Sequence, residues 1–408
     1  MTGARAVSRC DQLGAPPYSD MPGGLFRAYL TPAYFAAQDA LAGWMAKAGM
    51  TVRRDPAANL VGRYEGVDPQ APALIIGSHL DSVRDGGRYD GPLGIMLGIE
   101  CVASLSAQGK RLPFAIEVYA FGDEEGSRFP AAMLTSRAVA GTLHPATLDM
   151  ADADGVSVAV ALPGDIDAYL AAARRPRTTL AYLEAHIEQG PVLEADGLAV
   201  GTVTGIAAQL RYSVVVRGMA GHAGTTTMRL RRDPLAGAAA MVLAVEQLAR
   251  SDNSDVVATV GVIEAAPGAP NVIPGEVRFT IDVRSGVAAR RDAVAEAILA
   301  RIAEIAKARD LEIAIERIHD LPASPCDPVL MDLMDAALAA AGQPVRRLVS
   351  GAGHDAMNMA ALCPTTMLFI RCKGGISHNP AEHVDPADAE IALKVMLGFI
   401  ERLAARYA

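Results

Sequence analysis

The sequence predicts an α/β protein with a mainly parallel sheet flanked by helices, interrupted by an inserted α+β domain. Apolar runs of strand length alternate with helix-like segments over the first half of the chain, and this alternation returns near its end. Between them, the pattern changes to strand, helix, two strands, helix and strand. A chain of 408 residues is also too long for one ordinary core. We therefore expect a larger domain from residues 1–209 and 326–408, and an insertion over 210–325.

The first segment of the larger domain begins with a well-marked helix. Thr31 supplies a capping hydroxyl and Pro32 suits the first helical position, so a helix is expected to continue to the glycine of AKAG. Strands are expected at NLVGRY, PALIIGS, FAIEVYAFG, TTLAYLEAHI and LAVGTVTGIAA, with the helix GIMLGIECVASLSAQ between the second and third. Strands separated by helices are typical of parallel βαβ units.

The insertion has a different order of elements. We expect strand LRYSVVVRG, helix DPLAGAAAMVLAVEQLARS, strands VVATVGVIEA and GEVRFTIDVRS, helix AARRDAVAEAILARIAEIAKA and strand LEIAIERIH. This βαββαβ order predicts a compact α+β domain. After it, VRRLVSG, DAMNMAALC, TTMLFIRC and AEIALKVMLGFIERLAARY resume the alternation of strands and helices and would complete the first sheet.

Composition excludes several classes of protein. A net charge of −9 argues against nucleic acid or an anionic membrane as the main partner. No apolar stretch approaches the roughly 20 residues of a membrane helix, and the first 30 residues lack the apolar centre of a signal peptide. The default location is therefore cytoplasmic. Five scattered cysteines, none in a CxxC spacing, argue against a disulfide framework or a zinc ribbon.

Five side chains that could bind a metal ion stand at predicted strand ends or in the adjoining loops. They are His79, Asp90, Glu125, His186 and His378. Histidines together with carboxylates suit zinc, manganese or cobalt, whereas calcium prefers oxygen alone. Each residue by itself is more often structural than a ligand. All five at strand ends of a parallel sheet form a pattern that chance rarely produces, so we expect a metal site assembled from distant loops.

A longer set of motifs carries a resemblance to a known family. GSHLDSV, GGRYDGPLG, GDEEGSRF, EAHIEQGPVLE, GHAGTT, NVIPGEVRFTIDVR, SGAGHDA and GISHNPAEHVDPAD follow one another along the chain. In content and order they resemble the metal-dependent amidohydrolases of the M20 peptidase clan. The similarity is to the branch of allantoate amidohydrolases, N-carbamoyl-L-amino-acid hydrolases and β-ureidopropionases, and it covers almost the whole chain. It implies that the insertion is a lid through which the chain also forms a homodimer.

The resemblance implies two divalent metal ions, zinc or manganese, with cobalt as a further option. His79, Asp90 and His186 would hold one ion, while Asp90, Glu125 and His378 hold the other. A carboxylate has two oxygens and can therefore span ions roughly 3.5 to 4 Å apart. Asp90, in GGRYDG, would be the bridging carboxylate. The glycines around it would let the chain turn sharply enough for His79 and Asp90 to face the same ions.

Two further acids have roles implied by the resemblance. Glu124, next to the ligand Glu125, stands at the position of the general base. Metals lower the pKa of bound water toward about 7, so a nearby carboxylate can take its proton. The resulting hydroxide attacks a carbonyl carbon, the metals stabilise the oxyanion, and Glu124 returns the proton to the leaving nitrogen. Asp81, two residues after His79, would accept a hydrogen bond from that histidine and fix its tautomer.

A second set of matched positions concerns the substrate. Its members are Gln189, Gln209, His222, Asn271, Arg284 and Gly353. Arg284 and Asn271 match positions that bind a substrate carboxylate, for which a guanidinium fork is a natural partner. His222 matches a lid histidine that polarises the scissile carbonyl and that related dimers deliver from the neighbouring subunit. Gln189 and Gln209 match positions that face the ureido group.

The resemblance thus implies hydrolysis of a linear ureido or carbamoyl C–N bond. The segment YSDMPGGLFRAYLTPAYFAAQDALAGWMAKAGM looks most like allantoate amidohydrolases, which release ammonia and carbon dioxide and leave ureidoglycine. N-carbamoyl-L-amino-acid hydrolysis, or β-ureidopropionase activity, is the close alternative. A metallo-exopeptidase or deacylase of the same clan, or an inactive binding homologue, are more distant ones. The sequence departs from the family pattern at Ala58, Ala208 and Thr227, where glycine, glycine and proline are usual.

Overall fold

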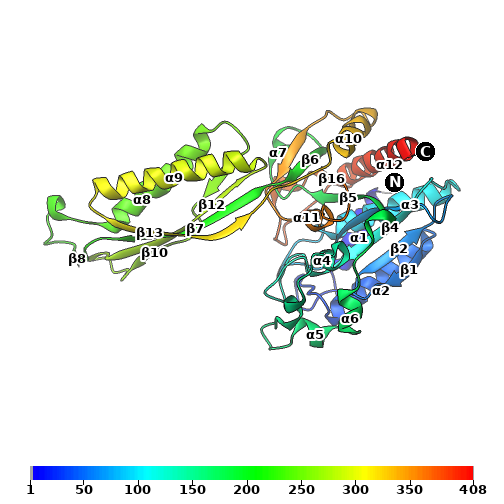
Figure 1. The fold of residues 1–408 in the computed structure, drawn as a ribbon, viewed down its shortest axis with the longest axis horizontal. Helices are drawn as coiled ribbons and strands as arrows, with labels where there is room; N and C mark the ends of the chain where they lie inside the picture. The colour runs from blue at the N-terminus through cyan, green and yellow to red at the C-terminus, as the bar shows by residue number, and fades with distance from the viewer. Residues whose placement is uncertain (1–2, 408) are drawn as a thin grey trace. The chain divides into compact units, whose positions relative to one another are not determined.

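The computed structural model describes residues 3–407 and divides into two compact units, each with its own apolar core. Unit 1 contains the residues up to Thr204, Cys326–Leu348 and the chain from Ala352 onward. Unit 2 contains Gly205–Pro325 together with Val349–Gly351. The predicted fold class is confirmed: unit 1 has a largely parallel central sheet flanked by helices, and unit 2 has a separate antiparallel sheet (Figure 1).

A nine-stranded sheet forms the frame of unit 1, and its short last strand, Ser324–Pro325, is counted in unit 2. Its order is β1-β2-β4-β3-β5-β16-β6-β14, with β15 also paired to β6. The strands are β1 (Thr51–Arg54), β2 (Leu60–Tyr64), β3 (Ala73–His79), β4 (Ala115–Phe121), β5 (Thr179–Ile187), β6 (Val200–Ile206), β14 (Ser324–Pro325), β15 (Arg347–Ser350) and β16 (Thr365–Ile370). Strands β4, β3, β5 and β16 are mutually parallel, so their carboxyl ends share one edge. Every residue of β3, β4 and β16 is buried, as expected for parallel strands covered on both faces.

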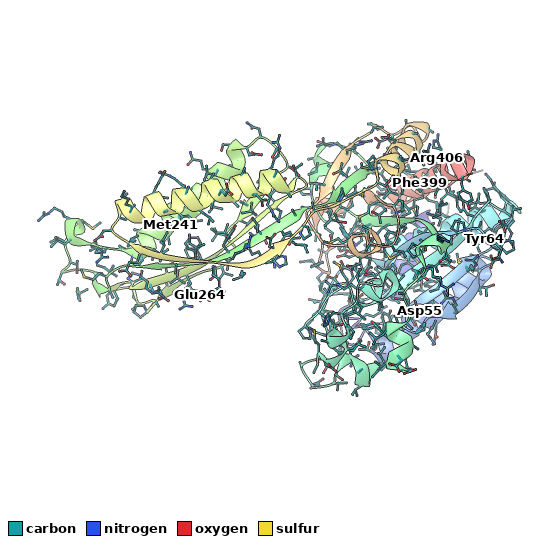
Figure 2. All side chains as sticks on the ribbon, viewed as in Figure 1. Asp55, Tyr64, Met241, Glu264, Phe399 and Arg406 are labelled. Atoms are coloured by element: carbon teal, nitrogen blue, oxygen red, sulfur yellow. The ribbon has the colours of Figure 1, made fainter. Side chains whose placement is uncertain are left out.

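The helices of unit 1 bury apolar faces against this sheet and one another. They are α1 (Gly3–Leu13), α2 (Pro32–Lys47), α3 (Pro92–Ala107), α4 (Leu134–Ala140), α5 (Val158–Ala161), α6 (Ile166–Leu170), α7 (Val192–Ala195), α10 (Pro328–Ala340), α11 (Ala356–Met359) and α12 (Pro386–Tyr407). Phe399 on α12 is fully buried, whereas Glu264 on a strand of unit 2 is exposed (Figure 2). No helix among residues 3–407 is both long and apolar enough to cross a bilayer.

The helices of unit 1 agree only in part with those predicted from the sequence. The helix at Thr31 is confirmed, since the threonine hydroxyl accepts a hydrogen bond from the Tyr34 N–H. Helices α1 and α10 were not predicted, and DAMNMAALC forms only the short helix α11. Ala58 adopts a left-handed conformation with φ of 57°. This conformation favours glycine, which explains why glycine is usual there in the family that the sequence resembles.

Unit 2 is a five-stranded antiparallel sheet with order β10-β12-β7-β13, with β9 also paired to β12. Its strands and helices are β7 (Ala208–Arg217), β8 (Gly221–His222), α8 (Pro234–Ser251), β9 (Val257–Thr259), β10 (Ile263–Ala266), β11 (Val272–Ile273), β12 (Glu276–Ser285), α9 (Ala288–Ala308) and β13 (Glu312–Leu321). The predicted strand VVATVGVIEA is therefore two strands, β9 and β10. Val277, Phe279, Ile281 and Val283 alternate along β12 and are buried, while the polar residues between them lie on its other face.

Candidate metal centre and substrate site

The five predicted ligands meet at one edge of the unit 1 sheet. His79 is the last residue of β3 and His186 lies one residue before the end of β5. Glu125 follows β4, and His378 lies in the loop after β16. Asp90 stands in the loop between β3 and α3. Because these parallel strands end at the same edge, the fold brings together side chains that are up to 299 positions apart in sequence.

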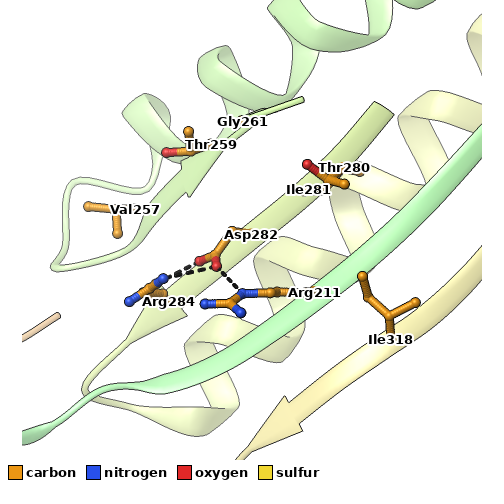
Figure 3. Close-up of a pocket in the computed structure, with 9 residues that line it drawn as sticks. All are labelled: Arg211, Val257, Thr259, Gly261, Thr280, Ile281, Asp282, Arg284 and Ile318. Atoms are coloured by element: carbon orange, nitrogen blue, oxygen red, sulfur yellow. Dashed lines mark hydrogen bonds and ion pairs between the residues drawn. The ribbon is translucent and has the colours of Figure 1, made fainter. Parts of the chain in front are cut away.

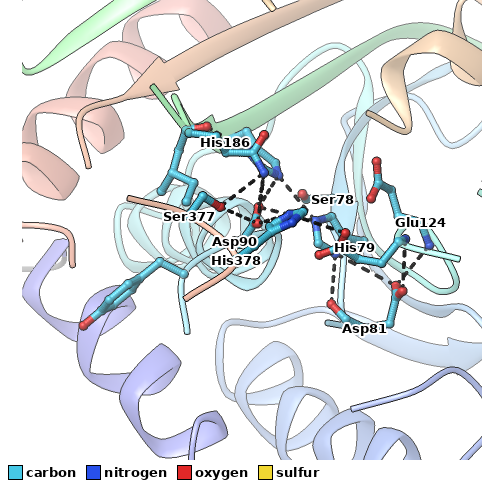
Figure 4. Close-up of polar contacts among 12 residues, drawn as sticks. Ser78, His79, Asp81, Asp90, Glu124, His186, Ser377 and His378 are labelled. Atoms are coloured by element: carbon cyan, nitrogen blue, oxygen red, sulfur yellow. Dashed lines mark hydrogen bonds and ion pairs between the residues drawn. The ribbon is translucent and has the colours of Figure 1, made fainter. Parts of the chain in front are cut away.

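Asp90 faces two separate groups of side chains with its two carboxylate oxygens (Figure 4). Oδ1 lies 3.1 Å from His186 Nε2 and 3.8 Å from His79 Nε2. Oδ2 lies 3.2 Å from His378 Nε2, which is also 3.5 Å from a carboxylate oxygen of Glu125. Each group of three offers ligand atoms within 4.8 Å of one another. The arrangement has the two-sided geometry of a bridging carboxylate.

Backbone carbonyls fix which nitrogen of each inner histidine faces the site. His79 Nδ1 lies 3.0 Å from the carbonyl oxygen of Asp81, and His186 Nδ1 lies 2.9 Å from that of Ile187. A carbonyl can only accept, so each Nδ1 carries a proton and each Nε2 is the nitrogen that faces Asp90. The Asp81 carboxylate is more distant, at 3.9 Å from His79 Nδ1. The backbone of Asp81, more than its carboxylate, therefore sets the tautomer of His79.

The Asp81 carboxylate instead holds the segment that carries the two glutamates. Its oxygens accept the backbone N–H groups of Glu124 and Glu125, each at 3.2 Å. Glu124 is buried, and its carboxylate lies within 4.8 Å of ligand atoms of His79 and Glu125. This places Glu124 beside the ligand cluster but outside both groups that share Asp90. Asp123, just before it, has a left-handed φ of 59°, one of three such non-glycine residues at the site with Gln189 and His378.

Two glycines and a glutamate bring the ligand loops together. At Gly91, where φ is 84°, a Cβ would lie 2.5 Å from the His79 ring. Glu382, which follows His378, accepts the backbone N–H groups of Tyr89 at 2.8 Å and Asp90 at 3.1 Å. At Gly87 a Cβ would lie 2.1 Å from the Glu382 carboxyl carbon. Glycine is therefore required at both positions for the loops to approach.

The electrostatics of the cluster favour cations. Burial raises the pKa of Glu124 well above its usual range, and burial together with the charge of Asp90 raises that of Glu125 to about 7. A hydrogen bond to Asp90 is the main cause that raises the pKa of His378 to about 9. Burial acts against ionisation of Asp90, but hydrogen bonds from three histidines outweigh it and lower its pKa. Bound protons thus neutralise the negative charge of the buried carboxylates. Divalent ions could take the place of these protons.

The donor set fits small divalent ions. The candidate ligands are imidazole nitrogens and carboxylate oxygens, which suit zinc or manganese. Around a tetrahedral ion with bonds of about 2.0 to 2.1 Å, neighbouring ligand atoms are roughly 3.3 Å apart. The distances of 3.1 to 3.8 Å from Asp90 to the three histidines are of that size. The site could therefore accept metal ions with little movement of its ligands.

The two predicted substrate residues of unit 1 lie in loops. The Gln189 amide nitrogen donates to both oxygens of Asp90, at 3.1 and 2.9 Å, while its amide oxygen is buried without a protein partner. That oxygen is available to accept a hydrogen bond from a ligand. Gly353 follows β15, and a Cβ there would lie 2.7 Å from the Met133 methyl carbon. That methyl is the end of a flexible side chain and can move, so packing alone does not require glycine at this position.

The four predicted substrate residues of unit 2 form two pairs at opposite ends of its sheet. Gln209 and Arg284 are directly opposed on β7 and β12. His222 and Asn271 meet at the other end, where β8 pairs with β11 and the Ala223 N–H donates to the Asn271 carbonyl at 3.0 Å. Figure 1 shows β8 beyond the end of β7 that is remote from Gln209. Strand β12 has ten residues, so its ends lie roughly 30 Å apart at about 3.4 Å per residue.

Two buried residues behind the cluster, Glu184 and His354, were not predicted. Glu184 accepts hydrogen bonds from Ser78 Oγ at 3.1 Å and from the Ala356 N–H at 3.0 Å, and it groups with His186 and His354. A signal was present in TTLAYLEAHI, where an acid interrupts an apolar run two residues before a predicted ligand and so lies on the same face of the strand. His354 had no such signal, because it enters from a distant loop.

Comparison with known proteins gives a consistent picture. The family model described as peptidase family M20/M25/M40 matches residues 75–402. An N-carbamoyl-L-amino acid amidohydrolase from Geobacillus stearothermophilus is 43% identical over 385 residues, covering 94% of this chain and 94% of the relative. Allantoate deiminase 1 from Glycine max is 40% identical over 431 residues, covering 98% and 89%. A crystal structure of a hydantoinase/carbamoylase family amidase from Burkholderia multivorans superposes with a TM-score of 0.91 at 36% identity, covering 98% of both chains.

Proposed function

Since this chain belongs to peptidase family M20/M25/M40 and is an amidohydrolase acting on a ureido or carbamoyl C–N bond, we propose that its substrate is allantoate. The observation that carries metal-dependent hydrolysis at this site is the placement of Asp90 between two groups of candidate ligands. Allantoate is favoured because the segment leading into α2 resembles allantoate amidohydrolases. The relative named allantoate deiminase also matches 98% of the chain.

The metal centre proposed here has two sets of ligands. His79, His186 and Asp90 would hold one divalent ion, and His378, Glu125 and Asp90 the other. When bound, the two ions would lower the pKa of a water molecule and stabilise negative charge on the substrate carbonyl oxygen. The protein contributes the fixed Nε2 lone pairs and a loop geometry that holds the Asp90 carboxylate between them.

Glu124 is the proton carrier in this account. Its carboxylate lies beside His79 and Glu125, and its backbone is fixed by Asp81. As general base it would take the proton of the attacking water at a carboxylate oxygen and then deliver it to the leaving nitrogen. Burial raises the pKa of Glu124, which makes its carboxylate a stronger proton acceptor than an exposed glutamate. Gln189 Oε1, buried without a protein partner, would accept an N–H of the ureido group.

The substrate residues of unit 2 require a second copy of the chain. Arg284 and Gln209 lie near one end of the sheet, and His222 and Asn271 lie beyond the other. A separation of roughly 30 Å along the strands far exceeds the size of a ureido acid. The two pairs therefore contact one substrate only if different chains supply them. We propose that the protein is a homodimer in which His222 and Asn271 complete the site of the neighbouring chain.

N-carbamoyl-L-amino acids are the second candidate substrates, because the relative of that name is 43% identical. Protein stripped of metal and reloaded with manganese or zinc should be offered allantoate, N-carbamoyl-L-amino acids, N-carbamoyl-β-alanine and dipeptides. Ammonia and the organic product are measured together. Ureidoglycine formed from allantoate supports the proposal, whereas faster release of a free amino acid from a carbamoyl derivative selects the second candidate. Cleavage of dipeptides alone would refute both.

A further inference from the structure

A pocket of about 460 Å³ opens on the polar face of the unit 2 sheet (Figure 3). Arg211, Asp282 and Arg284 form its charged wall, and Val257 and Ile318 are among its apolar residues. Only Arg284 of these was expected to contact substrate. The pocket thus contains a second guanidinium, that of Arg211, which is not among the matched substrate positions.

Asp282 holds the two arginines side by side. It accepts Arg284 Nε at 2.7 Å and Arg284 Nη2 at 3.0 Å, and it accepts Arg211 Nε at 2.6 Å. Arg284 Nη1 also donates to the carbonyl of Gly351 at 2.5 Å. Burial acts against ionisation of Asp282, but the hydrogen bonds from Arg284 and then Arg211 outweigh it and lower its pKa. The group therefore carries two positive charges and one negative charge at neutral pH.

The donors that stay free differ between the two arginines. Arg284 uses Nε, Nη1 and Nη2, so only one N–H remains on each terminal nitrogen. Arg211 donates to Asp282 through Nε alone. Its two terminal nitrogens keep the paired N–H groups that bind a carboxylate in a bidentate manner. Of the two guanidiniums in this pocket, that of Arg211 therefore has more N–H groups free to bind a carboxylate in a bidentate manner.

Two features distinguish the group of Arg211, Asp282 and Arg284 from an ordinary surface ion pair: its second arginine and a nearby bulge. Glu276, on the same strand, also joins two arginines, Arg217 and Arg278, each at 2.8 Å. Arg211 and Arg217 are similarly exposed, at 44% and 49%, so the difference lies in the second arginine of each group. Arg278 is 62% exposed, whereas Arg284 is 26% exposed and anchored to a backbone carbonyl. The register of β13 also shifts between Arg317 and His319, at Ile318. A bulge of this kind redirects a side chain, and Ile318 accordingly lines the pocket.

We infer that Arg211 is a specificity-determining residue that binds the substrate carboxylate together with Arg284, with Asp282 positioning both guanidiniums. Val257 and Ile318, 55% and 52% exposed, would pack against the carbon atoms next to that carboxylate. The inference rests on the proposed function, because a ureido acid is the anion that this pocket would receive. It adds to that function a second cation and an apolar wall.

The experiment measures equilibrium binding, so that it does not depend on turnover. In the Glu124→Gln background, calorimetry compares allantoate, N-carbamoylglycine and N-carbamoylglycinamide before and after Arg211→Gln. Loss of a charge-assisted hydrogen-bonded pair should weaken binding of the acids by roughly 10- to 100-fold and leave the amide within about twofold. Arg217→Gln is the matched control, because it sits on the same strand and pairs with Glu276 in the same way. It should leave binding of all three ligands unchanged.

Three outcomes are distinguishable. Selective loss of the acids in Arg211→Gln alone supports the inference. Equal affinities in Arg211→Gln and Arg217→Gln, an equal loss for acid and amide, or no acid binding to the parent would overturn it. Failure of the proposed function has a different signature, which is absence of ammonia release from every ureido acid by the metal-loaded wild type. Melting temperatures of the variants verify that they are folded.

Discussion

Mixing two inactive variants tests whether His222 acts on the neighbouring chain. His222→Ala removes the imidazole that we propose acts on the neighbouring chain, and Glu124→Gln removes the proposed general base. Each variant alone should be almost inactive. His222 lies at the end of the unit 2 sheet opposite to Arg284, roughly 30 Å away along the strands. One chain therefore cannot direct both residues at one ureido acid. In a mixed dimer, one site receives Glu124 from one chain and His222 from the other, while the second site lacks both.

The magnitude follows from counting sites. After complete random exchange about half of the dimers are mixed, and one of their two sites is intact, so the ceiling is about a quarter of wild-type activity. Ammonia release is followed after mild dissociation and reassociation, with exchange verified by mass-tagged chains. Mixing Glu124→Gln with Glu125→Gln is the matched control, because both changes lie in unit 1 and neither mixed site is whole. Verified exchange without recovery beyond the parents would refute delivery of His222 from the partner.

The remaining predictions concern the base, the carboxylate site and the ligands. Glu124→Gln should lower kcat by at least about 10²-fold with both metals retained. Glu125→Gln should instead lose metal, as measured by elemental analysis. Loss of metal in Glu124→Gln would contradict the assignment of Glu124 as the base. Arg284→Lys should raise KM for the ureido acid by an amount equivalent to roughly 1 to 3 kcal/mol without lowering the melting temperature, while Arg278→Lys on the same strand should not; equal KM values in both would remove the carboxylate role. In the metal-free protein the pKa of His378 is raised to about 9, so it is protonated at pH 7 and must release that proton to bind metal. Metal affinity should therefore increase with pH up to about 9, and titration heats should differ between buffers of unlike ionisation enthalpy; identical heats would contradict this.

Strand-end positions made the ligand cluster predictable from sequence. An apolar run followed by a polar, glycine-rich loop indicates where a parallel strand ends, and the ends of neighbouring strands share an edge. That reasoning alone selected His79, Asp90, Glu125, His186 and His378. It did not indicate which oxygen of Asp90 faces which histidine, because that depends on the loop held by Glu382 and on the glycines beside it.

Cross-strand contacts were the part that the sequence could not supply. Asp282 and Arg284 are recognisable as neighbours on one face of a strand from their spacing of two. Arg211 joins them only through the register of β7 against β12, which no local pattern reveals. The opposite placement of His222 and Arg284 likewise follows from strand lengths and pairing. Helix α1 was not predicted, although Ala6, Val7, Cys10 and Leu13 recur at helical spacing and are buried.

We propose that Asp90 would hold two metal ions together, with His79 and His186 on one side and Glu125 and His378 on the other. Ammonia release from the preferred ureido acid is measured while metal-free protein is titrated with manganese or zinc, and bound metal is counted at each step. We expect no activity without metal and activity that saturates at two ions per chain. Full activity in the stripped protein, or saturation with a single ion bound, would contradict it.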